Sequence, residues 1–225
     1  VCSSDLALHP PILPVPSEDA APRAIAQTGG VPKLEALRLH HGTVWRWNRA
    51  VYDPADGGHL RVELRPLPAG PTVIDMAANA AFALGLTLSL RPGAESLVTA
   101  LTFGQARRNF YAAARDGLDA ELLWPDAADV TTAVQPRRAD ALVLRLIPQA
   151  RAGLVAAGVD AQEVDAMLEI ISGRTRSGQT GAIWQRRALA AFEQTQPRAQ
   201  ALTAMLERYM SNAESGAPVH TWPIT

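Results

Sequence analysis

The sequence predicts an α+β protein in which an antiparallel β-hairpin is followed by a mainly helical region. Two short runs with strand character lie at residues 43–51 and 59–67, and apolar residues at helical spacing dominate after residue 72. The 225 residues are 48% hydrophobic and 19% charged, which is enough apolar material to bury a substantial core.

The first 34 residues contribute little to this prediction. Residues 1–6, VCSSDL, resemble a translated sequencing-adapter sequence, so we expect this chain to be the C-terminal part of a longer protein. Residues 7–34 contain six prolines and the pair Gly29 and Gly30, a composition typical of a linker or loop. We therefore expect the folded region to span residues 35–225.

The two strand-like runs predict a hairpin because residues 53–58, DPADGG, favour a turn. Helix signals then follow in order. Thr72 with Asp75, and Thr102 with Gln105, form capping-box-like starts, and Asp160 with Glu163 forms another. We expect helices at residues 72–88, 102–117, 139–157, 160–173, 181–194 and 198–214, with a kink at Pro148 in the third.

The composition excludes several classes of function. The 21 basic and 22 acidic residues give a formal net charge of -1, which argues against a protein that mainly neutralises nucleic-acid phosphates or anionic lipid. The longest weakly polar run, residues 71–90, is too polar for a membrane span. The single cysteine, Cys2, belongs to the adapter-like segment. We expect a soluble, cytoplasmic protein that binds neither nucleic acid nor membrane.

The hairpin is the main candidate for a functional site. Polar residues alternate with apolar ones along the second strand, which places the two kinds on opposite faces: His59, Arg61, Glu63 and Arg65 on one, and Leu60, Val62 and Leu64 on the other. If the apolar faces of both strands coincide and pack on the helices, the first strand adds Trp45, Trp47 and Val51 to the apolar face and Arg46 and Asn48 to the polar one, while Arg49 breaks the pattern.

A carboxylate among guanidinium groups suits an anionic ligand that carries a divalent cation. Arginine binds phosphate or carboxylate oxygens, and Glu63 would hold the metal. A solvated outer sheet face gives the same alternation, so this alternative stays open.

A second candidate is the Gly-containing segment of residues 174–187, RTRSGQTGAIWQRR, which enters a helix. Its backbone amides and arginines could hold an anion, although an ordinary turn between helices is equally consistent with it. Zinc is not expected at His40 and His41, because no further spaced ligand accompanies them. His220 and Trp222 are expected to pack in the C-terminal tail, and no nucleophile elbow is present.

Three segments together resemble the C-terminal half of bacterial glutamate-cysteine ligase-like carboxylate-amine ligases. They are HGTVWRWNR at residues 41–49, HLRVELRPLPAGPTVIDM at residues 59–76 and TGAIWQR at residues 180–186. The resemblance extends, with gaps, from about residue 35 to the end. It implies a fold related to glutamine synthetase, whose antiparallel sheet binds ATP, metal ions and an amino acid, and a role of the glutathione-biosynthesis type.

The resemblance also implies a reaction and residue roles. ATP phosphorylates a carboxylate, and an amine attacks the acyl phosphate to give an amide. Glu63 corresponds to a glutamate that binds Mg²⁺ and Arg65 to an arginine that contacts phosphate. Arg46, Asn48, Arg49 and Arg61 are expected to contact ATP or the amino-acid substrate. No Glu-x-Glu occurs in the chain, so the family's other metal-binding glutamates would precede it.

Two functions therefore remain open. The first is part of an ATP-dependent ligase, inactive as this chain alone and able to form homo-oligomers through an unpaired sheet edge. The second is a non-catalytic helical binding or assembly domain whose hairpin arginines dock an acidic partner. A concave sheet face that gathers Glu63, Arg65 and Arg46 would favour the first, and a flat, exposed apolar helix face the second.

Overall fold

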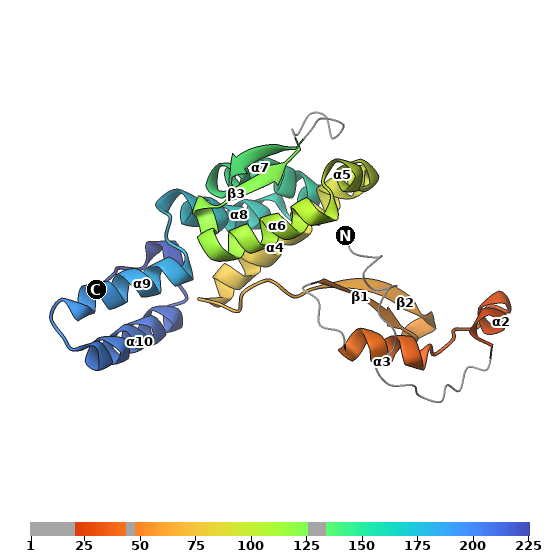
Figure 1. The fold of residues 1–225 in the computed structure, drawn as a ribbon, viewed down its shortest axis with the longest axis horizontal. Helices are drawn as coiled ribbons and strands as arrows, with labels where there is room; N and C mark the ends of the chain where they lie inside the picture. The colour runs from red at the N-terminus through yellow and green to blue at the C-terminus, as the bar shows by residue number, and fades with distance from the viewer. Residues whose placement is uncertain (1–20, 44–47, 126–133) are drawn as a thin grey trace. The chain divides into compact units, whose positions relative to one another are not determined.

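The computed structural model describes residues 21–43, 48–125 and 134–225, and it confirms the α+β class. The chain is 68% helical and contains two small antiparallel sheets in its described part (Figure 1). It divides between Leu67 and Pro68 into two compact units, a boundary that the sequence did not predict. The two units are described separately below.

The first unit contains the predicted hairpin. Its elements are α2 (Pro22–Gln27), α3 (Glu35–Thr43), β1 (Asn48–Asp53), the 3₁₀ turn η1 (Ala55–Gly57) and β2 (His59–Leu64). Two expectations were wrong. Residues 22–27 form a short helix rather than linker, since Pro22 occupies a first-turn position where no amide donor is needed. Thr43 was expected to begin the first strand, but it is the last residue of α3, and β1 spans Asn48–Asp53.

The register of the hairpin corrects the predicted faces. Arg49 pairs with Glu63 and Val51 with Arg61, and residues directly opposite each other share one face. Asn48, opposite Leu64, therefore lies on the apolar face and Arg49 on the polar one. Val51 was expected on the same face as Leu60, and this was wrong. A register shift of one residue moves every side chain of a strand to the other face of the sheet. Trp45, Arg46 and Trp47 lie outside the described residues.

The apolar face of β2 is not packed on helices, contrary to expectation. Leu60 and Val62 are 80% and 68% exposed, and Leu64 is half-buried. The physical reason is that α3 contacts the hairpin through its polar face. The Arg49 Nη1 donates a hydrogen bond of 3.1 Å to the backbone carbonyl of His41, at the end of α3. This contact leaves the aliphatic side chains of β2 in solvent.

The second unit begins with α4 (Val73–Leu90), η2 (Arg91–Gly93), α5 (Ala94–Ala100), α6 (Phe103–Asp116) and η3 (Gly117–Asp119). It continues with α7 (Ala139–Ala156), α8 (Ala161–Ser177), α9 (Gly181–Glu193), α10 (Arg198–Glu214) and η4 (Val219–Thr221). The six predicted helices are all present. Thr72, Thr102 and Asp160 cap α4, α6 and α8 as expected, each accepting a backbone hydrogen bond from the first turn.

Helix α8 is longer than predicted. It runs through Gly173 and ends at Ser177, where Gly178 adopts a left-handed conformation with φ of 63°. Gly173 does not end the helix but gives room to the ring of His220, which a Cβ at this position would meet. Pro148 lies inside α7, which continues past it to Ala156.

A second hairpin, unpredicted, joins α6 to α7. Strand β3 (Glu121–Trp124) pairs antiparallel with β4 (Gln135–Arg138). The side-chain amide of Asn109, on α6, accepts from the Leu123 N–H at 2.8 Å and donates to its carbonyl at 2.7 Å. This amide pairing attaches β3 to α6.

The core of the second unit lies where α4, α7 and α8 pack together. Glycines allow the α4 and α7 backbones to touch. A Cβ on Gly85 would collide with the Ala150 carbonyl, and one on Gly153 would collide with the Gly85 carbonyl. The fully buried Ala78 and Ala150 continue this close contact along the two helices.

The C-terminal tail fastens α4, α8 and α9 to one another. The buried Asp75 accepts a 3.0 Å hydrogen bond from the Val219 amide. Gln179 donates to the Val219 and Trp222 carbonyls, and the Trp184 indole donates to the Pro223 carbonyl at 2.8 Å. Trp222 is buried, which confirms its predicted role in tail packing.

Residues Val73–Ala100 are long and apolar enough to cross a membrane by length and composition. The sequence did not predict this. The stretch begins with α4, which carries the buried Asp75 and packs on α7 and α8, and 17% of its apolar window is buried. One such helix within the described residues is consistent with the prediction of a soluble protein.

Candidate functional site

The polar face of the β1–β2 hairpin contains a charged network centred on Glu63. Arg49 and Arg65 bind its two carboxylate oxygens from opposite sides: the Arg49 Nη2 lies 2.6 Å from Oε2 and the Arg65 Nε lies 3.1 Å from Oε1. Both guanidinium groups are largely buried, with side chains 21% and 11% exposed. The hydrogen bond from Arg65, followed by that from Arg49, lowers the pKa of Glu63 below its usual range.

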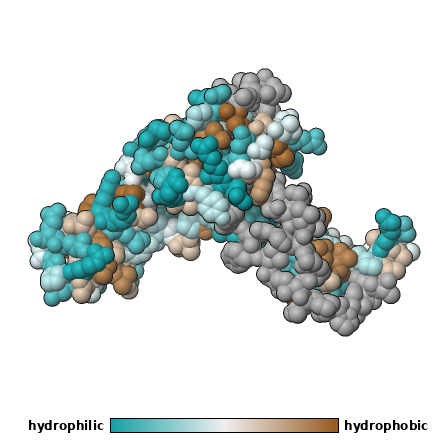
Figure 2. All heavy atoms as spheres, in the orientation of Figure 1, coloured by the Kyte–Doolittle hydropathy of each residue, from teal (hydrophilic) through white to brown (hydrophobic). Residues whose placement is uncertain are grey.

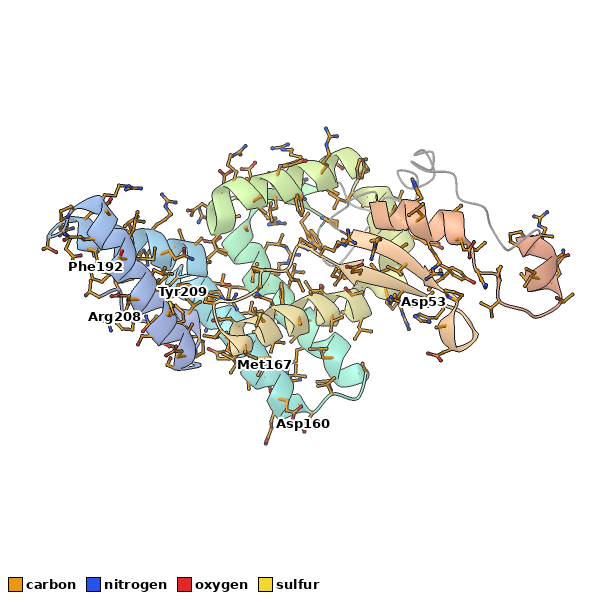
Figure 3. All side chains as sticks on the ribbon, turned by 90° about the horizontal axis from the view of Figure 1, so that it is seen from below. Asp53, Asp160, Met167, Phe192, Arg208 and Tyr209 are labelled. Atoms are coloured by element: carbon orange, nitrogen blue, oxygen red, sulfur yellow. The ribbon has the colours of Figure 1, made fainter. Side chains whose placement is uncertain are left out.

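A second charged cluster lies at the other end of the same face. The Arg61 Nη1 is 3.1 Å from the Asp53 carboxylate and 2.8 Å from the His59 ring. Asp53, at the end of β1 (Figure 3), also accepts from the Ala55 amide at 3.1 Å. That backbone bond and the Arg61 side chain lower the pKa of Asp53, so it is a carboxylate at neutral pH.

Between these clusters and α3 lies a small cavity of about 200 Å³, lined by Arg38 and His41 of α3 and by Arg49, Asp53 and Arg61 of the hairpin, among others. Arg38 makes no side-chain hydrogen bond or ion pair within the described residues. Burial, followed by the neighbouring charges of His40 and Arg49, lowers the pKa of His41, so its ring is neutral at neutral pH.

The cavity is suited to an anionic group rather than to a whole cofactor. Ligand pockets usually measure about 300–1,000 Å³, and this one is smaller. Among the described residues the guanidinium group of Arg38 has no partner, and those of Arg49 and Arg61 are oriented by carboxylates. Arginine groups fixed in this way can bind the oxygens of a phosphate or carboxylate in a forked geometry.

The described residues do not fit a divalent cation at Glu63. Both of its oxygens are occupied by guanidinium groups. Mg²⁺ prefers several oxygen ligands, and no group of three or more His, Cys, Asp or Glu side chains within the described ranges could hold a metal. The role of Glu63 as a metal ligand stays a prediction that these contacts do not support.

The structure brings together some of the predicted site residues. Arg49, Glu63 and Arg65 form one network, and Arg61 lies on the same face through its pairing with Asp53. Asn48 is on the opposite face, and Arg46 is outside the described part of the chain. Sequence reasoning missed Arg38 and His41, since a helix over residues 35–43 was not predicted. A Glu35 start followed by apolar Ala36, Leu37 and Leu39 was the available signal.

Comparisons with known proteins return no match: no protein-family model, curated protein or solved structure is significantly similar to this chain. The ligase resemblance therefore depends on the three sequence segments alone.

Proposed function

We propose that this chain is the C-terminal part of an ATP-dependent carboxylate-amine ligase of the glutamate-cysteine ligase type. The observation that supports it is the Arg49–Glu63–Arg65 network beside a small cationic cavity. These residues belong to the segments that resemble the ligases. ATP and an amino acid are the proposed ligands, and the cytoplasm, which supplies both, is the proposed location.

In this proposal the hairpin arginines bind the negatively charged phosphoryl group that is transferred during the reaction. The terminal phosphoryl group of ATP is transferred to a carboxylate, giving ADP and an acyl phosphate. An amine then displaces phosphate, and an amide forms. Fixed guanidinium groups stabilise the oxygens of the transferring phosphoryl group without having to reorganise. Glu63 is a positioning residue here, because it orients Arg49 and Arg65.

The test uses the protein encoded by the complete open reading frame, assayed for ADP release with glutamate and a panel of amines. Arg38→Gln removes the unpaired cation of the cavity and should raise the KM of the anionic substrate about tenfold, the loss expected for one charged hydrogen bond. Arg23→Gln, on the exposed face of α2, is the matched control and should leave KM unchanged. Equal kinetics for both variants would contradict the placement of the site.

Glu63→Gln tests the positioning role. It removes the charge that holds two arginines, so kcat/KM should fall about 100-fold while the circular dichroism spectrum persists. Near-normal turnover would exclude Glu63 from the site. The 225-residue chain alone should release no ADP, because its described residues provide no divalent-cation site for phosphoryl transfer.

A second candidate, a helical binding or assembly domain, is favoured by one observation. Leu202, Leu206 and Met210 lie four residues apart along α10 and are 40–54% exposed. Hydrophobic side chains also reach the surface over the α9–α10 pair (Figure 2). If this function holds, Leu206→Glu should abolish self-association or partner binding measured by light scattering, and ADP release should be absent in the complete protein.

A further inference from the structure

The helical unit contains a larger cavity, of about 450 Å³, apart from the hairpin site. One wall consists of the end of α6, η3 and the start of α7. The other consists of the end of α8, the connection to α9 and the first turns of α9. Its volume falls within the range of small-molecule sites.

The acidic groups of this cavity are partly neutralised by ion pairs. Asp116 forms an ion pair of 2.7 Å with Arg115. Asp119 and Asp140 both bind Arg138, at 2.9 and 2.8 Å. These three carboxylates share two guanidinium groups, so one negative charge remains on this wall.

The basic groups on the opposite wall are not neutralised. Arg176 on α8, and Arg186 and Arg187 on α9, line the cavity, and none of them makes a side-chain hydrogen bond or ion pair within the described residues. Their side chains are exposed. The wall thus carries three positive charges that make no ion pair within the described residues, and these exceed the one negative charge left on the facing wall.

The backbone that carries these arginines is held in place. Gly178 ends α8 in a left-handed conformation, and the buried Gln179 donates two 2.9 Å hydrogen bonds to the C-terminal tail. The Thr180 hydroxyl caps α9 by accepting from the Ile183 amide. That cap satisfies one amide of the first turn of α9, and the arginine side chains are the charged groups available to a ligand.

We infer that this cavity binds a small molecule that carries a chain of phosphate groups. A di- or triphosphate offers several charges and many acceptor oxygens to three guanidinium forks, whereas a single carboxylate offers one charge and two oxygens. The inference goes beyond the proposed function, whose anion site is on the hairpin, and it does not depend on ligase activity.

The experiment measures binding of tripolyphosphate and of ATP to the 225-residue chain by isothermal titration calorimetry. The triple variant Arg176→Gln, Arg186→Gln, Arg187→Gln should weaken binding at least about tenfold, because each lost charged hydrogen bond lowers affinity. Arg208→Gln is the matched control (Figure 3): it removes an exposed arginine of α10 that does not line the cavity and makes no ion pair in the described part of the chain. The Arg208→Gln variant should bind both probes with the affinity of the unchanged chain.

Other outcomes distinguish a nucleotide from a simple phosphate chain as the ligand, and the helical cavity from the hairpin as the binding site. Binding of ATP alone, lost in the triple variant, supports a nucleotide as the phosphate source, and equal binding of both probes supports the phosphate chain itself. The double hairpin variant Arg38→Gln, Arg61→Gln removes two cations of the proposed hairpin site, and the helical cavity should still bind tripolyphosphate in it. If the hairpin variant loses binding and the triple variant does not, or if the control loses as much as the triple variant, the inference is overturned. Matching thermal transitions establish that all variants are folded.

Discussion

The β1–β2 hairpin and the α4–α7–α8 core are stabilised by different kinds of contact. In the hairpin charged side chains form ion pairs with one another, and Leu60 remains 80% exposed. In the helical core Ala78 and Ala150 are fully buried, and glycines bring two backbones into contact. The comparison teaches that charge organises the candidate site, whereas packing supplies the stability of the second unit.

The largest expected effect follows from Trp184, a fully buried side chain whose indole donates to the Pro223 carbonyl. Trp184→Ala should reduce the free energy of unfolding of the helical unit by about 3–5 kcal/mol. Val62→Ala, on the exposed face of β2, should change the free energy of unfolding of the hairpin unit by less than about 0.5 kcal/mol. Urea unfolding checks both values, and similar losses would remove the contrast between the two units.

A smaller effect is expected at the contact between α4 and α7. Gly85→Ala places a methyl group against the Ala150 carbonyl and should cost about 1–3 kcal/mol. Gly104→Ala is the matched control, because a Cβ on this α6 residue would meet no neighbouring atom. The control should be stabilising by up to about 1 kcal/mol, since alanine favours a helix. Thermal unfolding measures both, and the same sign for both substitutions would contradict the predicted close approach.

The smallest effect concerns the hairpin and pH. The folded pKa of Glu63 is lower than its ordinary value of 4.5, so the ion pairs stabilise the hairpin above that value. This stabilisation is lost as the pH falls below 4.5 and through the lowered folded pKa. Amide NMR signals of β1 and β2 should therefore change in acid before the signals of the helical core do.

Glu63→Gln is the control for that titration. It should remove the part of the acid-dependent change and of the salt dependence that comes from the Glu63 ion pairs, because screening acts on exposed ion pairs. A hairpin transition that persists in this variant would have to be assigned to Asp53, whose pKa is also lowered.

The helices of the second unit could be predicted because their signals are local. Thr72, Thr102 and Asp160 mark helix starts through hydrogen bonds to the next few residues. The strand pair β3–β4 could not be predicted, because Pro136 and two arginines carry no strand pattern. Its attachment depends on Asn109, fourteen residues away in the sequence from Leu123.

The candidate site was predictable in some of its residues but not in its geometry, and Arg38 and His41 of α3 were missed. The sequence singled out Glu63 and Arg65, and alternation placed both on a polar face. Which face Arg49 joins depends on a register difference of one residue, which the sequence pattern does not determine. The facing wall of the helical cavity, with Asp116 and Asp140, comes from segments distant in sequence from Arg186 and so carried no local signal.

The fastening of the tail by Asp75, Gln179 and Trp184 has a consequence for the order of folding. The bond between Asp75 and Val219 spans 144 residues, and the indole of Trp184 reaches 39 residues ahead to Pro223. Contacts with such long separations are slow to form because a large loop must close first. During synthesis, α4, α7 and α8 can pack as soon as they leave the ribosome, but α9 waits for the tail. The helical unit thus finishes folding only after its last residues are made.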